Sequence, residues 1–148
     1  MSLKLKLVLT KKFISKLIER EIDDPSHVES AMNLLSELTR RNNTIQNFTI
    51  QDISMITHSQ VNEDVWQLAF ELSNLSIPLF TVYVIYYDES GEEEVIDEDE
   101  ELVNIFSKHE IINPFNGQEY LSYADYKDHI EILFRANKEL LENLKSQF

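Results

Sequence analysis

The distribution of charge is the feature of this sequence that most restricts its folding. The chain has 13 Lys and Arg against 27 Asp and Glu, which gives a formal net charge of −14. Residues 42–107 hold 14 of the acidic side chains and no Lys or Arg, whereas the rest of the chain carries 13 residues of each sign. Carboxylates are rarely buried without a partner. The acids of this middle segment are therefore expected to face water, and the molecule is expected to be a strong electrical dipole.

Composition and charge argue against several classes of protein. A net charge of −14 disfavours nucleic acid and anionic membranes as direct partners. The absence of Cys removes disulfides, thiol catalysis and cysteine-ligated metals, and it makes the cytoplasm the default location. No apolar run approaches the roughly 20 residues of a membrane span, and the N-terminus lacks the apolar core of a signal peptide. With 148 residues, 43% of them apolar, the chain suits one compact domain or a small domain with an appendage.

The first half of the sequence predicts amphipathic helices. The first is expected over residues 11–22, and Ser26 and Glu29 have the capping-box spacing that would open a second helix ending near Arg41. Residues 3–9 alternate in a way that predicts a short strand, with a helix as the alternative. The N-caps expected from these and later patterns are Thr10, Ser26, Thr49, Asn62 and Asn137.

The second half contains the clearest strand signal. Residues 80–87 are all β-branched or aromatic, and both faces of such a strand would be apolar, so at least one should be covered. Shorter strands are expected at 111–112 and 130–134. Residues 88–101 hold ten acidic side chains and predict a solvated loop, whose last acids begin a further helix.

One stretch resembles a known architecture. Offsets of four, seven, eleven and twelve residues relate Val65, Ala69, Leu72, Ser76 and Ile77, and a strand at 80–87 follows them. Thr49 and Ile53 fit the opening of a preceding helix. In this order, residues 30–88 resemble a winged-helix domain, in which a short helix, a turn and a second helix precede a β wing. Three features depart from that pattern: Ser76 stands where Gly is usual, the turn at 57–61 lacks Gly, and Pro78 is unexpected.

The resemblance implies an α+β fold. It would comprise N-terminal helices, a winged-helix-like helix-turn-helix with a β wing, and a small α/β C-terminal extension. We expect residues 1–88 to form the helical domain with its basic N-terminal segment, and residues 89–148 to form the acidic loop and the extension packed on that domain. A single domain over 1–148 is the alternative. Residues 110–119 are similar to part of the winged-helix accessory proteins of bacterial defence operons.

The acidity of the second helix removes DNA binding from this resemblance. A recognition helix needs cations for phosphates and polar side chains for base edges, but residues 63–74 contain no Lys or Arg. Residues 92–94, three consecutive Glu, would repel DNA as well. We therefore predict a surface that docks a basic region of a protein partner. Its residues are Glu63, Asp64, Trp66, Gln67, Phe70, Glu71, Glu92, Glu93 and Glu94.

No combination of residues predicts catalysis, a metal or a cofactor. The histidines are widely separated and match no HExxH or paired-ligand spacing, so surface or hydrogen-bonded roles are expected for His27, His58, His109 and His129. The acids at 97–101 lack the register of a calcium-binding EF-hand loop. With only two glycines, a Gly-rich phosphate loop is excluded. We predict a protein that is not an enzyme.

Two functions fit these observations best, while an enzyme with an unrecognised site and direct DNA binding through the basic N-terminal segment are lesser alternatives. The first is a non-catalytic adaptor or regulator, of a bacterial defence or toxin-antitoxin type, that docks a basic partner. The alternative is an antitoxin, an immunity protein or a DNA mimic that inhibits a nucleic-acid-binding protein. Neither function involves direct contact with nucleic acid or membrane. A homodimer through a strand edge at 3–9 or at 80–87 stays open.

Overall fold

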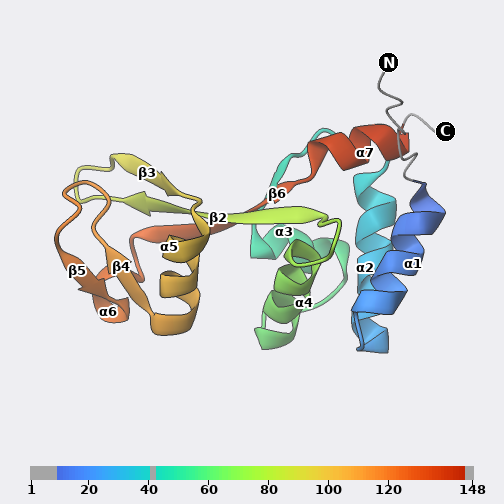
Figure 1. Cartoon of the computed structure of the whole chain (residues 1–148), viewed down its shortest axis with the longest axis horizontal. Coiled ribbons are helices and arrows are strands. Elements are labelled where there is room, and N and C mark those ends of the chain that lie inside the picture. Colours follow the sequence, from blue (N-terminus) through green and yellow to red (C-terminus); the bar gives the residue numbers. More distant parts are fainter. Residues whose placement is uncertain (1–9, 41–42, 146–148) are drawn as a thin grey trace, which may run out of the picture. The chain divides into compact units, whose positions relative to one another are not determined.

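The computed structural model describes residues 10–40 and 43–145, and it has an α+β fold (Figure 1). The expected segment at 3–9 lies outside the described residues. The helices are α1 (Lys11–Glu21), α2 (Pro25–Leu38), α3 (Ile50–Ile56), α4 (Glu63–Ser73), α5 (Asp99–Val103), the π-helix η1 (Asn104–Lys108), α6 (Tyr123–Tyr126) and α7 (Lys138–Lys145). The strands are β1 (Asn47–Phe48), β2 (Phe80–Tyr87), β3 (Glu93–Ile96), β4 (Glu110–Ile112), β5 (Tyr120–Ser122) and β6 (Ile130–Ala136).

The described strands form two sheets. The larger has the order β1-β6-β2-β3, and the smaller pairs β4 with β5. Strand β3 runs antiparallel to β2, with Val84 opposite Ile96 and Tyr87 opposite Glu93. Because β2 has β6 on one side and β3 on the other, it is an inner strand. The strand edge considered for a homodimer at residues 80–87 is therefore occupied by β3 over Val84–Tyr87, and a homodimer itself stays a prediction.

The chain divides into two compact units. Unit 1 contains Met1–Thr81 and Arg135–Phe148, and unit 2 contains Val82–Phe134. The domain boundary expected at residue 88 is thus shifted, and the C-terminal helix belongs with the N-terminal helices. The reason is a set of backbone hydrogen bonds within unit 1: Ala136 donates to Gln46 (2.7 Å) and Asn137 donates to Leu79 (2.9 Å).

The two units share the charge very unequally. Unit 2 contains 15 of the 27 acidic residues but only 2 of the 13 Lys and Arg, which gives it a formal net charge of −13. Unit 1 holds the remainder and is left with −1. The folded unit that carries the charge is therefore not the 42–107 segment as a whole, but the part of the chain that begins in β2 and ends in β6.

Unit 1 has a core made mainly of helix faces. Its fully buried side chains come from all four N-terminal helices and include Ile14, Ile18, Leu34, Leu35, Leu38, Ile53 and Leu72. The expected caps at Thr10, Thr49, Asn62 and Asn137 are confirmed, each accepting a hydrogen bond from a backbone N–H in the first turn of its helix. Thr49 and Asp52 form a reciprocal capping box.

The cap of α2 differs from the expectation. Asp24, rather than Ser26, is the N-cap, and its Oδ1 accepts hydrogen bonds from the backbone N–H and the hydroxyl of Ser26. Pro25 occupies the first helical position, where its missing N–H costs nothing and its fixed φ suits a helix. The helix therefore begins two residues earlier than predicted, and it ends at Leu38.

A left-handed residue ends α3. His58 has φ of 54° and directly follows the C-cap Thr57. The His58 N–H donates to the carbonyl of Met55 (3.3 Å), and the Ser59 N–H donates to that of Ser54 (2.9 Å). These two bonds make a Schellman motif, in which a Gly is the usual left-handed residue. The turn between α3 and α4 thus forms without the Gly that its sequence lacks.

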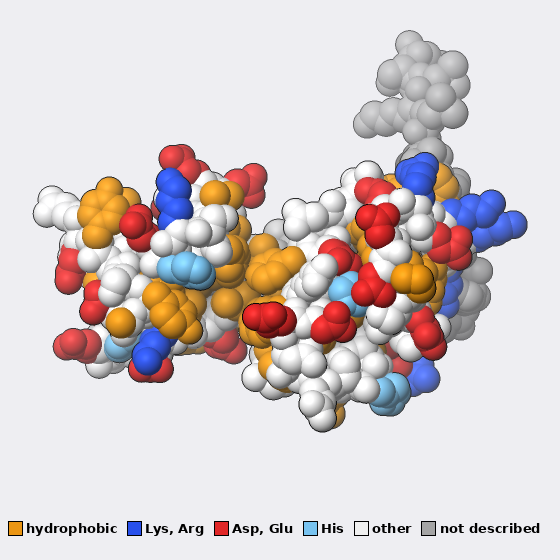
Figure 2. Space-filling view, turned by 90° about the horizontal axis from the view of Figure 1, so that it is seen from below, with side chains coloured by type: hydrophobic (Ala, Val, Ile, Leu, Met, Phe, Trp, Pro, Cys, Tyr) orange, Lys and Arg blue, Asp and Glu red, His pale blue; other side chains and the backbone are white. Residues whose placement is uncertain are grey.

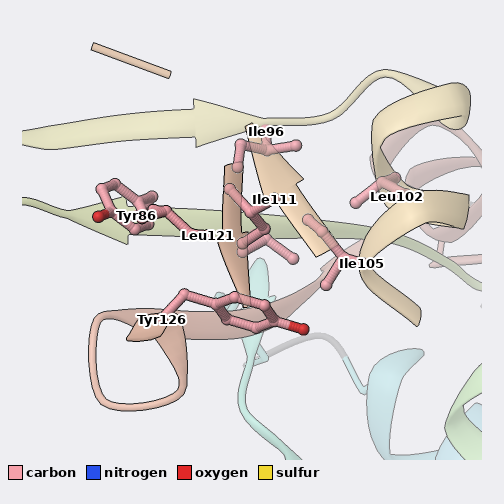
Figure 3. Packing of buried hydrophobic residues seen from close by; sticks show 8 residues of the cluster. Tyr86, Ile96, Leu102, Ile105, Ile111, Leu121 and Tyr126 are labelled. Carbon is pink, nitrogen blue, oxygen red and sulfur yellow. The ribbon is translucent and has the colours of Figure 1, made fainter. Parts of the chain in front are cut away.

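Unit 2 has a small core of its own (Figure 3). Its buried side chains come from strands, from α6 and from the helical segment after the acidic run, and they are Val84, Tyr86, Ile96, Leu102, Ile105, Ile111, Leu121 and Tyr126. The expected solvated loop at 88–101 is therefore corrected: four of its residues form β3, because Ile96 enters this core while Glu93 and Glu94 stay exposed beside Tyr87 and Tyr86. The helix expected at the end of the acidic run is confirmed as α5.

No helix in the described ranges combines the length and the apolar character that a bilayer crossing requires.

Candidate functional site

An acidic groove lies on the surface of unit 2. Its volume is about 610 Å³, and its walls come from β2, the turn after it, the 113–119 loop and α6. Aromatic and carboxylate side chains dominate the lining, which comprises Tyr86, Asp88, Glu89, Ser90, Asn113, Phe115, Glu119, Leu121, Asp125 and His129. Three rings gather there: the Tyr86 centroid is 6.0 Å from that of Phe115 and 6.3 Å from that of His129. The groove therefore combines apolar ring surface with four carboxylates.

Two of these carboxylates are fixed by the local backbone. Asp88 Oδ1 accepts hydrogen bonds from the Ser90 N–H, the Ser90 hydroxyl (2.6 Å) and the Glu92 N–H. Asp125 Oδ2 accepts from the N–H and the hydroxyl of Ser122 in the capping box of α6. The bonds from Ser90 and from Ser122 hold the pKa values of Asp88 and Asp125, respectively, below the usual range. Both groups are therefore ionised at neutral pH and held in one position.

The Tyr86 hydroxyl opens onto this groove. The Tyr86 side chain is only 7% exposed, and its oxygen points away from the other labelled core side chains in Figure 3. Within residues 10–40 and 43–145 the Tyr86 hydroxyl has no hydrogen-bond partner, and no Lys, Arg or His forms an ion pair with the four groove carboxylates. Burial, followed by the charges of Glu119 and Asp88, raises the pKa of Tyr86. The groove thus offers uncompensated negative potential and an unused hydroxyl group.

The exposed hairpin of unit 2 adds further carboxylates. Glu92, Glu93 and Glu94, expected to contact a partner, are all exposed, and β3 places Glu93 and Glu94 opposite Tyr87 and Tyr86. None of these three glutamates lines the groove. Figure 2 shows the wider pattern, in which red carboxylates and exposed apolar side chains are interspersed on the visible face.

The predicted contact surface on α4 lies in unit 1 and is only partly open. Trp66 and Phe70 are half-buried and stack with ring centroids 6.1 Å apart, while Glu63 and Gln67 are exposed. Gln67 Nε2 donates to Glu71 Oε1 (3.2 Å). The structure therefore places the nine predicted residues in two groups, six on α4 in unit 1 and three in the hairpin of unit 2.

Asp64 and Glu71 have a role that the sequence analysis missed. Both carboxylates hold His27, a residue of α2 that is 2% exposed. The distance from His27 Nε2 to Asp64 Oδ1 is 2.7 Å, and the distance from Nδ1 to Glu71 Oε2 is 2.9 Å. Burial lowers the pKa of His27, but the bonds to Asp64 and Glu71 outweigh it and the net direction is upward.

Sequence spacing could not reveal this cluster, because His27 is 37 and 44 residues from its two partners. The one local signal was the position of His27 four residues before Ala31 and eight before Leu35, on the face of α2 that is buried.

The chain matches no protein-family model, no curated protein and no solved structure, and hence no enzyme family.

Proposed function

We propose that this chain is a non-catalytic adaptor or regulator that docks a basic protein surface through unit 2. The observation that carries the proposal is the acidic groove: four carboxylates, two of them fixed by hydrogen bonds, lie beside aromatic rings in a unit with net charge −13, with no cation of the described chain paired to them. Uncompensated charge of one sign speeds association with a partner of the opposite sign and makes binding depend on salt.

The chemistry of the groove favours an arginine side chain of the partner. A guanidinium group can stack on an aromatic face and bind a carboxylate with two parallel hydrogen bonds. The groove supplies both: Phe115 presents an exposed ring, and Glu89 and Glu119 are carboxylates that make no hydrogen bond to a described side chain. The free Tyr86 hydroxyl adds one more acceptor. A lysine would use the charge but not the planar geometry.

A second candidate function is inhibition of a nucleic-acid-binding protein, as an antitoxin, an immunity protein or a DNA mimic. The observation that favours it is that the acidic segment is folded. Strand β3 and helix α5 hold exposed carboxylates in fixed positions, as an imitation of phosphates requires. The two functions differ in the outcome of one competition: a mimic would prevent its partner from binding duplex DNA, and an adaptor would not.

We infer that unit 1 uses a winged-helix-like arrangement for a purpose other than DNA binding. Support comes from the order of α3, a turn, α4 and then β2 in the larger sheet. The absence of Lys and Arg from α4 removes the phosphate contacts that a recognition helix makes. Protein partners of a bacterial defence or toxin-antitoxin system, in the cytoplasm, belong to this proposal; the lack of Cys is consistent with that location.

The proposal is tested with an oligoarginine peptide and the full chain. Titration of the ¹⁵N-labelled protein should shift the amide signals that surround the groove, with affinity that weakens at least about tenfold from low to physiological salt. The variant E89Q/E119Q removes two groove charges whose carboxylates make no hydrogen bond to a described side chain, so it should leave the fold intact. We expect its affinity to fall about tenfold.

The matched control is E93Q/E94Q. It removes the same charge from unit 2 but outside the groove, and we expect a loss of only about two- to threefold. Equal losses in the two variants would show that net charge, and not the groove, attracts the peptide. Binding that ignores both salt and the two variants would overturn the proposal.

A further inference from the structure

His27 in unit 1 stands at the centre of a cluster that has the composition of a metal site. Three potential ligand atoms surround one point: His27 Nε2, Asp64 Oδ1 and Asp24 Oδ2, all within 4.8 Å of one another. The Nε2 atom is 2.7 Å from Asp64 and 3.8 Å from Asp24. Ligand atoms in a tetrahedral zinc site lie about 3.3 Å apart when each is about 2.0 Å from the metal. The two observed distances lie on either side of that value.

The opposite nitrogen of His27 has the partner that a metal-bound histidine needs. Nδ1 lies 2.9 Å from Glu71 Oε2. In zinc sites the nitrogen that does not bind metal commonly donates its proton to a carboxylate, which fixes the tautomer and directs the other nitrogen toward the metal. This contact is independent of the Asp24–His27–Asp64 grouping. It orients the Nε2 of a 2% exposed side chain toward the two aspartates.

We propose that Asp24, His27 and Asp64 form a binding site for a divalent transition metal, with Zn²⁺ as the best match. One imidazole nitrogen with two carboxylates suits Zn²⁺ better than Mg²⁺ or Ca²⁺, which take oxygen ligands. Three protein ligands leave the fourth position for water. The site is separate from the acidic groove, and it would join the start of α2 to α4 within unit 1.

The charge of the cluster also favours a dication. Three carboxylates, those of Asp24, Asp64 and Glu71, surround one imidazole. A bound Zn²⁺ would offset two of these three negative charges. Metal binding thus compensates most of the negative charge of the cluster.

The local backbone can accommodate the metal without refolding. Asp24 uses Oδ1 to cap α2, which leaves Oδ2 for coordination. The side chains of Asp24 and Asp64 are 49% and 66% exposed, so each can move by a fraction of an ångström, whereas His27 is held by its burial. The exposure of the aspartates also gives the ion a path from solvent.

The test is calorimetric titration of the full chain with Zn²⁺, together with the visible spectrum of the Co²⁺ form. We expect one ion per chain and a Co²⁺ absorption typical of low coordination number. H27N should weaken Zn²⁺ binding at least about 100-fold, and E71Q should weaken it about 10- to 100-fold by removing the partner of Nδ1. Because H27N disturbs a buried residue, D24N/D64N provides a second variant: Asn keeps the N-cap at position 24 and removes only charge.

H58N is the matched control. It makes the same chemical change at an exposed histidine outside the cluster, and Asn tolerates the left-handed backbone of that position. We expect its Zn²⁺ affinity to equal that of the native chain. The proposal is overturned if the native chain binds neither ion, or if folded D24N/D64N and H27N bind Zn²⁺ as tightly as H58N does.

Discussion

Unit 1 and unit 2 differ in how their cores are built and in their net charge. Unit 1 packs the apolar faces of four helices and ends near neutrality, with a net charge of −1. Unit 2 assembles a core of eight side chains from short strands and short helices, and it tolerates a net charge of −13 because its carboxylates are largely exposed. The excess of acidic residues therefore contributes little to the stability of the helical unit 1. The negative charge is thus concentrated in the unit that has the smaller core.

The sharpest test of this comparison is a matched pair of core substitutions. Leu35 in unit 1 and Leu102 in unit 2 are 0% and 7% exposed. Leu35→Ala and Leu102→Ala should each lower the free energy of unfolding by about 2–5 kcal/mol, because each leaves a cavity. Hydrogen exchange should show amide protection lost mainly within the mutated unit. If either change removed protection equally from both units, they would be one cooperative unit, and the comparison would fail.

The pH dependence of the free energy of unfolding is the second property in which the two units should differ. His27 has a folded-state pKa above its unfolded value near 6.5, so its contribution is complete below that pH and is lost as the pH rises through the folded pKa. Asp88 and Asp125 have lowered pKa values, so their contributions are present above 3.8 and are lost as the pH falls. Both units should weaken in acid, because Glu21 and Asp24 of unit 1 also have lowered pKa values, and only unit 1 should also weaken as the pH rises through the pKa of His27.

This pH dependence is measured by denaturant unfolding in the presence of a chelator. H27N should cost unit 1 about 1–3 kcal/mol near pH 6, the usual worth of hydrogen bonds to a charged group, and should flatten its alkaline loss. A native chain whose unit 1 holds constant stability from mild acid to alkali would show that the bonds from Asp64 and Glu71 do not stabilise the imidazolium form.

The smallest expected effect concerns the left-handed turns. Unit 1 places His58 at φ of 54°, whereas unit 2 places Gly91 at φ of 86°. His58→Gly should raise stability by about 0.5–1 kcal/mol, because Gly adopts this conformation without strain, and Gly91→Ala should lower it by about 1 kcal/mol. Thermal melts of both variants provide the measurement. A lower melting temperature for H58G would mean that interactions of the His58 side chain stabilise the fold by more than its left-handed backbone conformation costs.

Local signals account for what could be predicted from the sequence. The capping box of Thr49 and Asp52 involves residues three apart, and the β-branched run of β2 is continuous, so both were visible. Strand β3 was not, because two of its four residues are Glu and its strand conformation comes from pairing with β2. The two-residue strand β1 likewise depends on its neighbour β6 in the sheet.

Prediction of the candidate sites depends even more on contacts between residues that are far apart in the sequence. Residues of the acidic groove come from positions 86 to 129, and the individual carboxylates could not be distinguished from the many others in that segment. The surface on α4 was predicted as a patch of acids beside Trp66 and Phe70, and their partial exposure is confirmed. That Asp64 and Glu71 face a buried histidine follows only from the packing of α2 on α4.

The strand order of the larger sheet has a consequence for how unit 2 is attached to the rest of the chain. The chain leaves unit 1 along β2 and returns along β6, its neighbour in the sheet, and the Tyr87 N–H donates to the His129 carbonyl (2.8 Å). Two adjacent strands need only a tight turn to be joined. Val82–Phe134 is therefore one continuous insertion between two neighbouring strands, and a chain in which a short turn replaces it would keep the strand ends and the helices of unit 1.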